Sequence, residues 1–266
     1  MLILLLFYGC LAFAIYQLPD NLFHIYFLNV DQGDSIFIKT PDNHQILIDG
    51  GPKTLVIEEL TKVMPFFDKS IDLAVLTHPH ADHLDGLIEV LKRYEVSAIL
   101  MTGIDYKSPN YDEFLNEIDK QGVEIFIAEN ISDFKFGTVL LDVIYPKNQM
   151  IGMNIDNVNN SSIAIKLNYK DKKILLVGDL EKEIEEELVA ANLDLSAQIL
   201  KAGHHGSKTA STPGFLKRVA PEIVVIQLGK NNSYGHPHEE ALENIKQSGV
   251  KSILRTDIEG QIEFTF

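Results

Sequence analysis

Residues 77–86 read Thr-His-Pro-His-Ala-Asp-His-Leu-Asp-Gly, and this stretch is the most informative part of the chain. It follows the apolar run 73–76, which predicts a buried strand, and leads into a helical pattern over 84–94. Three imidazoles and a carboxylate within six residues cannot all face one point on a helix or strand, whereas on a tight loop they can surround two adjacent cations. Neutral imidazole and carboxylate suit Zn²⁺, and Mn²⁺ or Fe²⁺ where oxygen ligands dominate. The stretch therefore predicts a metal site at the carboxyl end of a strand, where α/β proteins place their sites.

The rest of the chain alternates strand and helix patterns without a low-complexity linker or an exact repeat. Predicted strands cover residues 24–30, 35–40, 45–50, 73–76, 98–101, 124–128, 139–144, 163–167, 173–177, 198–201, 223–227, 252–255 and 261–264. Predicted helices cover residues 55–64, 84–94, 111–121, 181–191 and 237–247. Two successive β-then-α halves favour two sheets packed face to face with helices outside. We expect one domain over residues 21–266, after an N-terminal segment of residues 1–20.

Two more polar stretches follow predicted strands. Gly178-Asp179 comes after the strand 173–177, where the carboxylate could cap the next helix or bridge two cations with its two oxygens. The run 201–208 reads Lys-Ala-Gly-His-His-Gly-Ser-Lys, and its clustered histidines indicate metal ligation or proton transfer. Lys201, Ser207 and Lys208 would add groups that bind phosphate.

The pattern His-x-His-x-Asp-His in residues 78–83 resembles the signature motif of the metallo-β-lactamase superfamily. The resemblance implies an α/β fold, the αββα sandwich, with two divalent metal ions, Zn or Mn, at one edge of the sheets. By this resemblance, His78 and His80 are ligands of the first metal, and Asp82, His83 and His205 are ligands of the second. Asp179 is the aspartate that bridges the two metals. His205 is preferred over His204 because His-Gly-Ser resembles a pattern in related nucleases, although the two could be exchanged.

Five motifs together resemble the hydrolase domain of ComEC-type DNA-uptake proteins, over residues 22–266. They lie at residues 27–35, 48–51, 178–179, 201–207 and 234–238. Full ComEC-type proteins also contain many membrane helices and an oligonucleotide-binding-type domain that this sequence does not include. The resemblance therefore concerns the chemistry of the domain rather than transport.

The sequence departs from the wider superfamily at the first metal site. Many members supply a third histidine there, but none occurs between residues 84 and 203 of this chain. Asn159-Asn160-Ser161-Ser162 stands in its place, as is usual in ComEC-like domains. We expect a looser first site, held by its two histidines, Asp179 and water, with His236 able to help from its own loop.

Residues 2–18 carry no charged side chain. As a helix they would span about 25 Å, at the short end of what crosses a bilayer. We expect an anchor in a bacterial cell membrane with the domain on the outer face, the alternatives being a cleaved signal of a secreted protein or a buried segment. The single cysteine, Cys10, excludes an internal disulfide.

The predicted function is that of a metal-dependent phosphodiesterase, specifically a nuclease. Asp82 would help to hold the metals, Lys208 would stabilise negative charge, and His204 or His236 would protonate the leaving oxygen. The net charge of −15 opposes polyanion binding unless positive groups are gathered locally. The alternatives are an esterase, thioesterase or lactonase on the same fold, or a non-catalytic nucleic-acid-binding module.

Overall fold

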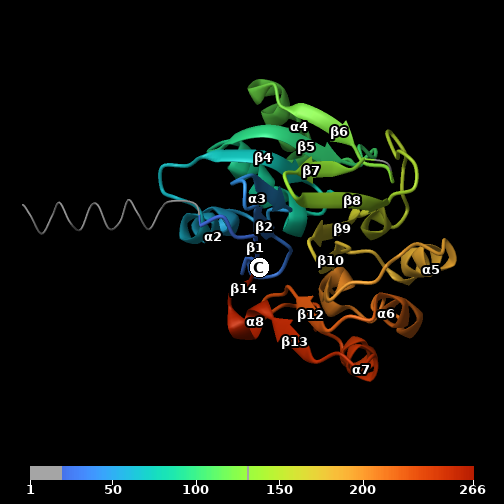
Figure 1. Cartoon of the computed structure of the whole chain (residues 1–266). Coiled ribbons are helices and arrows are strands. Elements are labelled where there is room, and N and C mark those ends of the chain that lie inside the picture. The colour runs from blue at the N-terminus through green and yellow to red at the C-terminus, as the bar shows by residue number, and fades with distance from the viewer. Residues whose placement is uncertain (1–19, 131) are drawn as a thin grey trace, which may run out of the picture.

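The computed structural model describes residues 20–130 and 132–266. Across them the chain forms two seven-stranded sheets with helices on both outer faces (Figure 1). The strands are β1 (His24–Phe27), β2 (Ile36–Lys39), β3 (Gln45–Ile48), β4 (Ser70–Val75), β5 (Glu95–Met101), β6 (Glu124–Ile127), β7 (Phe134–Phe136), β8 (Val139–Tyr145), β9 (Ala164–Tyr169), β10 (Lys172–Leu176), β11 (Ile199–Lys201), β12 (Ile223–Ile226), β13 (Ser252–Arg255) and β14 (Ile262–Thr265). The helices are α2 (Leu55–Val63), α3 (Ala81–Leu91), α4 (Pro109–Gln121), α5 (Lys182–Ala190), α6 (Pro213–Val219), α7 (Glu239–Gln247) and α8 (Thr256–Glu259), with short 3-10 turns η1 (Val158–Ser161) and η2 (Gly203–Gly206). The expected two-sheet α/β sandwich is confirmed.

Each sheet is antiparallel on one side and parallel on the other. The first has the order β14-β1-β2-β3-β4-β5-β6, antiparallel from β14 to β3 and parallel from β3 to β6. The second has the order β13-β12-β11-β10-β9-β8-β7, antiparallel from β7 to β10 and parallel from β10 to β13. Because parallel strands share their carboxyl edge, the loops after β3, β4, β10, β11 and β12 can meet at one end of the sandwich.

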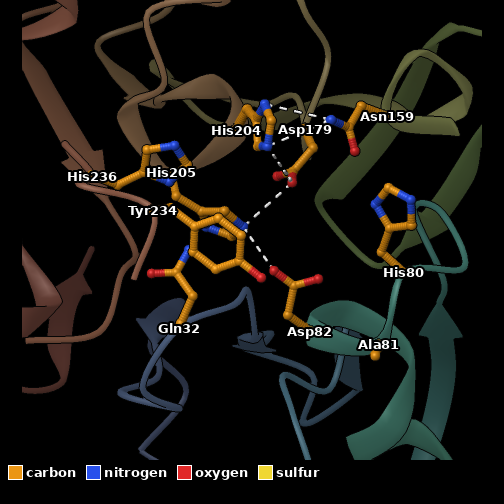
Figure 2. Close-up of a pocket in the computed structure, with 10 residues that line it drawn as sticks. All are labelled: Gln32, His80, Ala81, Asp82, Asn159, Asp179, His204, His205, Tyr234 and His236. Carbon is orange, nitrogen blue, oxygen red and sulfur yellow. Dashed lines mark hydrogen bonds and ion pairs between the residues drawn. The ribbon is translucent and has the colours of Figure 1, made fainter. Parts of the chain in front are cut away.

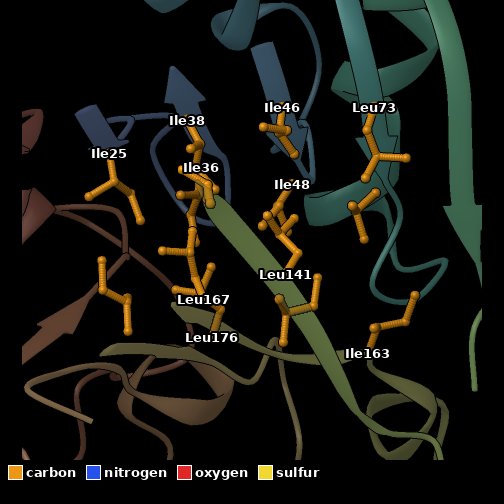
Figure 3. Packing of buried hydrophobic residues seen from close by; sticks show 14 of the residues in the cluster. Ile25, Ile36, Ile38, Ile46, Ile48, Leu73, Leu141, Ile163, Leu167 and Leu176 are labelled. Atoms are coloured by element: carbon orange, nitrogen blue, oxygen red, sulfur yellow. The ribbon is translucent and has the colours of Figure 1, made fainter. Parts of the chain in front are cut away.

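The core lies between the two sheets. Alternate residues of the first sheet point inward because side chains of a strand alternate between its faces. In Figure 3, Ile25, Ile36, Ile38, Ile46, Ile48 and Leu73 of the first sheet face Leu141, Leu167 and Leu176 of the second sheet and Ile163, which directly precedes β9. All of these side chains are buried. Because buried apolar area stabilises a fold by about 25 cal/mol per Å², this interface contributes strongly to folding.

Helices cover the outer faces and bury the remaining apolar residues. α2, α3 and α4 pack on the first sheet, while α5, α6 and α7 pack on the second. α4 shows how the sequence sets an end: Ser108 accepts a hydrogen bond from the Tyr111 N–H at the start, and Gly122 adopts a left-handed conformation at the end.

The prediction missed three short elements, β7, α6 and α8. α6 has seven residues, too few for a clear 3.6-residue period, although Thr212-Pro213 is a start signal that the sequence did carry. The prediction for α3 was wrong at its start, because the helix begins at Ala81 rather than Leu84. Asp82 therefore lies in the first helical turn, where a carboxylate interacts favourably with the helix dipole.

The expected membrane segment, residues 2–18, lies outside the described residues. Within 20–130 and 132–266, no helix combines the length and the apolar character that crossing a bilayer requires. The anchor and the domain boundary at residue 20 stay predictions.

Candidate metal centre

Asp179 lies at the centre of the clustered side chains. It follows β10, and its Oδ2 lies 3.3 Å from both His83 Nε2 and His205 Nε2. The same oxygen lies 3.9 Å from His78 Nε2 and 3.9 Å from His204 Nε2. The backbone N–H of Asp179 donates to Ser162 Oγ at 3.0 Å, which fixes the residue at the strand end. One carboxylate thus faces imidazoles from two segments of the chain, residues 78–83 and the turn at residues 204–205. Figure 2 shows Asp179 with His204 and His205.

The four candidate ligands of residues 78–83 lie partly on an extended segment and partly on a helix. His78 and His80 lie on the extended segment after β4, with His80 at the N-cap of α3. Asp82 and His83 lie in the first turn of that helix. Asp82 Oδ2 lies 3.4 Å from His205 Nε2, so Asp82, His83 and His205 gather around one point beside Asp179. The predicted second-site ligands are therefore brought together, with a helical turn in place of the expected loop.

Buried carboxylates stand behind two of these imidazoles. Asp49, directly after β3, places Oδ2 2.8 Å from His83 Nδ1 and also accepts the N–H and hydroxyl of Thr77. Asp34, in the β1–β2 loop, places Oδ1 3.2 Å from His205 Nδ1. A carboxylate or carbonyl oxygen on Nδ1 orients the ring so that Nε2 faces a metal. His83 has Asp49 in this position, whereas His205 has the Gln227 carbonyl oxygen at 2.9 Å with Asp34 beside it as an ion-pair partner. The sequence analysis named both aspartates only within the motifs at residues 27–35 and 48–51 and did not predict this role. Asp34 lies in a predicted loop, and Asp49 lies near the carboxyl end of the predicted strand 45–50.

Gly33 allows the Asp34 loop to reach this position. A Cβ on Gly33 would lie 2.2 Å from the backbone oxygen of Asp82, and its φ is +144°. The Asp34 N–H donates to that same oxygen at 3.2 Å. Because only glycine fits such a close approach, the loop can lock onto the start of α3.

His78 and His80 have different surroundings. His78 Nδ1 lies 3.2 Å from both Thr77 Oγ1 and Ser162 Oγ, and its Nε2 lies 3.1 Å from His80 Nδ1. No carboxylate within hydrogen-bonding distance of either ring is found among the described residues. Asn159 lies in the stretch that stands in place of the third histidine of many superfamily members. It lines the cavity beside these rings and donates to Glu181 Oε1 at 3.1 Å.

The prediction that Lys201 binds phosphate was wrong. Its side chain is fully buried at the end of β11, where the ammonium pairs with Asp34. It also donates to the Gly178 carbonyl at 2.9 Å and lies 3.6 Å from Asp179 Oδ1. Lys201 is therefore an internal counter-ion for the carboxylates, shielded from any substrate.

His204 and His205 form a strained turn. Both have left-handed backbones, with φ of 46° and 53°, which costs energy for residues other than glycine. The turn sends the rings to different sides. His205 points into the cluster with Nδ1 2.9 Å from the Gln227 carbonyl oxygen, whereas His204 places Nδ1 2.9 Å from Glu181 Oε1. This geometry agrees with the preference for His205 as the ligand.

The pKa values of the clustered histidines differ between the His83–His205 pair and the His78–His80 pair. Burial alone would lower the pKa of His83 and of His205, but Asp179 with Asp49 or Asp34 raises each pKa well above the usual value. Burial would raise the pKa of Asp179, yet His205 and His83 hold it well below its usual range. Burial lowers the pKa of His78 well below its ordinary value and also lowers that of His80. The carboxylates thus favour positive charge around Asp179.

Unpartnered atoms test whether a metal fits here. His83 Nε2, His205 Nε2 and Asp179 Oδ1 are buried without a hydrogen bond. Buried polar atoms are rarely left unpaired, so each such atom calls for an explanation. Three adjacent ones, of the atom types that ligate Zn²⁺, fit a bound cation.

A cavity of about 350 Å³ opens beside the cluster. Its described lining residues are Gln32, His80, Ala81, Asp82, Asn159, Asp179, His204, His205, Tyr234 and His236 (Figure 2). His236 is present as expected, and burial lowers its pKa to about 4, with further lowering by His205 and His204. Lys208 is exposed and does not line this cavity, so the structure does not place it at the reacting centre.

The two-sheet sandwich with a His/Asp cluster at the strand ends defines a metal-dependent hydrolase fold. Residues 28–230 match the family model described as Metallo-beta-lactamase superfamily, and the chain belongs to that superfamily. The chain is 27% identical over 256 residues to ComE operon protein 3 of Bacillus subtilis, covering 90% of this chain and 32% of that protein. It is 29% identical over 265 residues to Competence protein ComA of Neisseria gonorrhoeae, covering 98% and 35%. Both are ComEC-like, and the chain spans about a third of the length of these curated relatives.

Solved structures share the fold at low sequence identity. The metallo-beta-lactamase fold protein YhfI from Bacillus subtilis has a TM-score of 0.61 at 11% identity, covering 92% of this chain and all of that one. Human tRNase Z, short form, has a TM-score of 0.51 at 13% identity, covering 90% and 98%. At these identities the likeness shows the fold alone.

Proposed function

We propose that this domain is a metal-dependent phosphodiesterase that cleaves nucleic acid with two divalent cations, Zn or Mn. The position of Asp179 carries the proposal. One of its oxygens faces the His83–His205 pair and, at 3.9 Å, His78. A carboxylate between two sets of donors suits a pair of cations, the arrangement used for in-line displacement at phosphorus.

The residues of the chain have separable tasks in this proposal. Asp82, His83 and His205 would hold one cation and His78 with His80 the other, with Asp179 between them. Cations held there would supply Lewis acidity and activation of water near neutral pH. His204 is held from its Nδ1 side by Glu181 and Thr209, which leaves Nε2 on the side of Asp179. His204 is therefore the residue that we propose passes a proton to the leaving oxygen.

The comparisons support nucleic acid as the substrate class. One of the relatives named above is called a competence protein, and a protein named tRNase Z shares the fold. The net charge of −15 and the position of Lys208 outside the cavity argue for weak binding. We expect cleavage that slows as salt rises, with a shallow dependence because few phosphates are neutralised by the protein.

The test is hydrolysis by the purified chain loaded with Zn²⁺ or Mn²⁺. We expect slow cleavage of DNA or RNA and of a bis-aryl phosphate, and none by the His80→Ala, Asp82→Ala double variant. If the wild type with either metal cleaves neither nucleic acid nor the bis-aryl phosphate, the phosphodiesterase proposal is wrong.

One observation favours the rival chemistry on the same fold. The described lining of the cavity contains no Lys or Arg, which would equally suit a neutral ester, thioester or lactone. Nitrocefin and a thioester assayed beside the bis-aryl phosphate separate the two: faster turnover of either would favour the rival. The non-catalytic alternative has less support, because the six predicted metal ligands all lie in one cluster.

We also propose that residues 2–18 hold the domain at a bacterial membrane. The uncharged composition of this segment supports the proposal. Fractionation of cells that express the full chain tests it, since recovery of the whole population in the cytosol would contradict an anchor.

A further inference from the structure

Tyr234 is an exposed aromatic residue at the mouth of the metal cavity. It lines the cavity, and 62% of the residue is exposed. Its ring lies on that of His236, with 5.7 Å between centroids and 22° between planes. His236 in turn lies 5.4 Å from the His204 ring and 6.2 Å from the His205 ring. The Tyr234 ring is thus one ring away from the cluster (Figure 2), and most of the residue is exposed.

The loop that carries Tyr234 is fixed at several points. Asn232 donates to the carbonyls of Gly229 and His236, at 2.9 and 2.8 Å, and accepts the His236 N–H at 2.9 Å. The Gly229 N–H donates to Gln32 Oε1 at 3.2 Å, which ties the loop to the opposite wall. The ring is therefore pre-positioned, so binding a ligand against it orders little additional chain.

The cavity offers few other ways to hold a substrate. Its described lining contains histidines, amides, two aspartates, an alanine and this tyrosine, but no Lys or Arg. Lysine and arginine side chains therefore do not supply the affinity at this point. An open aromatic face can, because stacking of a nucleobase on such a face is a main source of affinity for single strands.

We propose that Tyr234, backed by His236, is a stacking subsite for one unpaired nucleobase next to the scissile phosphodiester. This inference rests on the proposed phosphodiesterase function and narrows its substrate to single-stranded or terminal nucleotides. Bases inside a duplex are covered on both faces by their neighbours, so they cannot present a face to Tyr234. The cavity volume of about 350 Å³ suits one ligand unit of nucleotide size rather than a duplex.

The first experiment compares cleavage of a thymidine oligonucleotide with that of the same oligonucleotide carrying abasic sites. The wild type, loaded with Mn²⁺, should favour the base-bearing strand in kcat/KM by about 10- to 100-fold, the effect of one base–aromatic stack. Tyr234→Leu should bring that ratio close to one, whereas Tyr234→Phe and Tyr234→Trp should keep it. Phe67→Leu is the matched control, because Phe67 is 64% exposed but does not line the cavity. Equal ratios in the wild type and in Tyr234→Leu would overturn the proposal.

A binding measurement separates failure of the subsite from failure of the phosphodiesterase proposal. Metal-free protein is titrated into a single-stranded oligonucleotide that contains 2-aminopurine, whose fluorescence falls when the base stacks. We expect quenching by the wild type and Tyr234→Phe, and at least about tenfold weaker quenching by Tyr234→Leu. Quenching without cleavage would uphold the subsite and reject the enzyme proposal. Cleavage with the same quenching curve for wild type and Tyr234→Leu would do the reverse.

Discussion

The two halves of the metal cluster are built differently. In the His83–His205 half, each ring is backed by a buried aspartate, and Lys201 pairs with one of those aspartates. In the half formed by His78 and His80, the rings meet hydroxyl groups and each other. The pKa values follow: the carboxylates raise those of His83 and His205, while burial lowers those of His78 and His80.

The difference teaches how unequal affinity can arise from similar ligands. A carboxylate behind an imidazole orients the ring and increases its basicity, which strengthens metal binding. A neutral hydroxyl fixes the orientation but adds less charge. We therefore expect the His83–His205 half to bind its cation more tightly, and the His78–His80 half to be the looser site expected from the missing third histidine.

The largest effect should come from the residue that both halves share. Asp179→Asn should lower kcat/KM by at least about 10³-fold, because each half loses its common carboxylate. Far-UV circular dichroism should be unchanged, since the two-sheet core is large enough to fold without metal. Asp171→Asn, a change at an exposed carboxylate, is the control. Unfolding on chelation of the wild type would contradict the separation of fold from metal.

Lys201→Met should destabilise the protein by about 3–5 kcal/mol, because it removes the buried ammonium that pairs with Asp34. Urea unfolding of metal-free protein measures the loss. Adding Asp34→Asn should recover part of it, since the double variant buries no unpaired charge. Lys251→Met, which removes an exposed ion pair, should change stability by less than about 1 kcal/mol. If the Lys201→Met protein were as stable as the wild type, the Lys201–Asp34 ion pair would not stabilise the His83–His205 half.

Glu185 on α5 is another buried carboxyl group, and it accepts the N–H groups of Ser211 and Thr212 at 2.7 and 2.8 Å. Burial raises the pKa of Glu185 from 4.5 to about 7. The folded state therefore binds this proton more tightly than the unfolded chain does. The resulting stabilisation is complete below pH 4.5 and is lost as the pH rises through about 7.

Glu185→Gln tests this linkage because an amide does not titrate. Between about pH 4.5 and about pH 8, the unfolding free energy of the wild type should fall relative to the variant by about 3 kcal/mol. Chemical denaturation at several pH values measures the difference between the two proteins. Parallel pH profiles would show that the carboxyl titrates normally in the fold.

The smallest expected effect compares the two halves directly. Asp49→Asn should weaken metal binding by about 10- to 100-fold, as the loss of a carboxylate behind a ligand does. Ser162→Ala removes the hydroxyl that lies behind His78 and that also accepts the Asp179 N–H. It should weaken metal binding by only about 2- to 10-fold, the cost of neutral hydrogen bonds. Zn²⁺ titration of the two variants against a competing chelator gives both values. Equal losses would show that the halves are supported equally.

Local sequence was sufficient for much of the site. The ligands in residues 78–83 are close in the chain, and Asp179 and His205 each follow an apolar strand, so the shared carboxyl edge brings them together. The periodic spacing of apolar residues also predicted most strands and helices in their correct order. Short elements such as β7 and α6 were missed because three to seven residues are too few to establish a period.

The sequence by itself therefore determined the fold class, the ligand loop and the chemical types of the donors, because these depend on residues near one another in the chain. Only the tertiary structure decided which polar residues support the ligands. Lys201 and Lys208 look alike in sequence, yet Lys201 is buried against Asp34 and Lys208 is exposed outside the cavity. Burial of a lysine requires a carboxylate brought to it by packing, here from a loop 167 residues earlier in the chain. No local pattern encodes that partner, since charge pairing in the core depends on which loops the two sheets bring together.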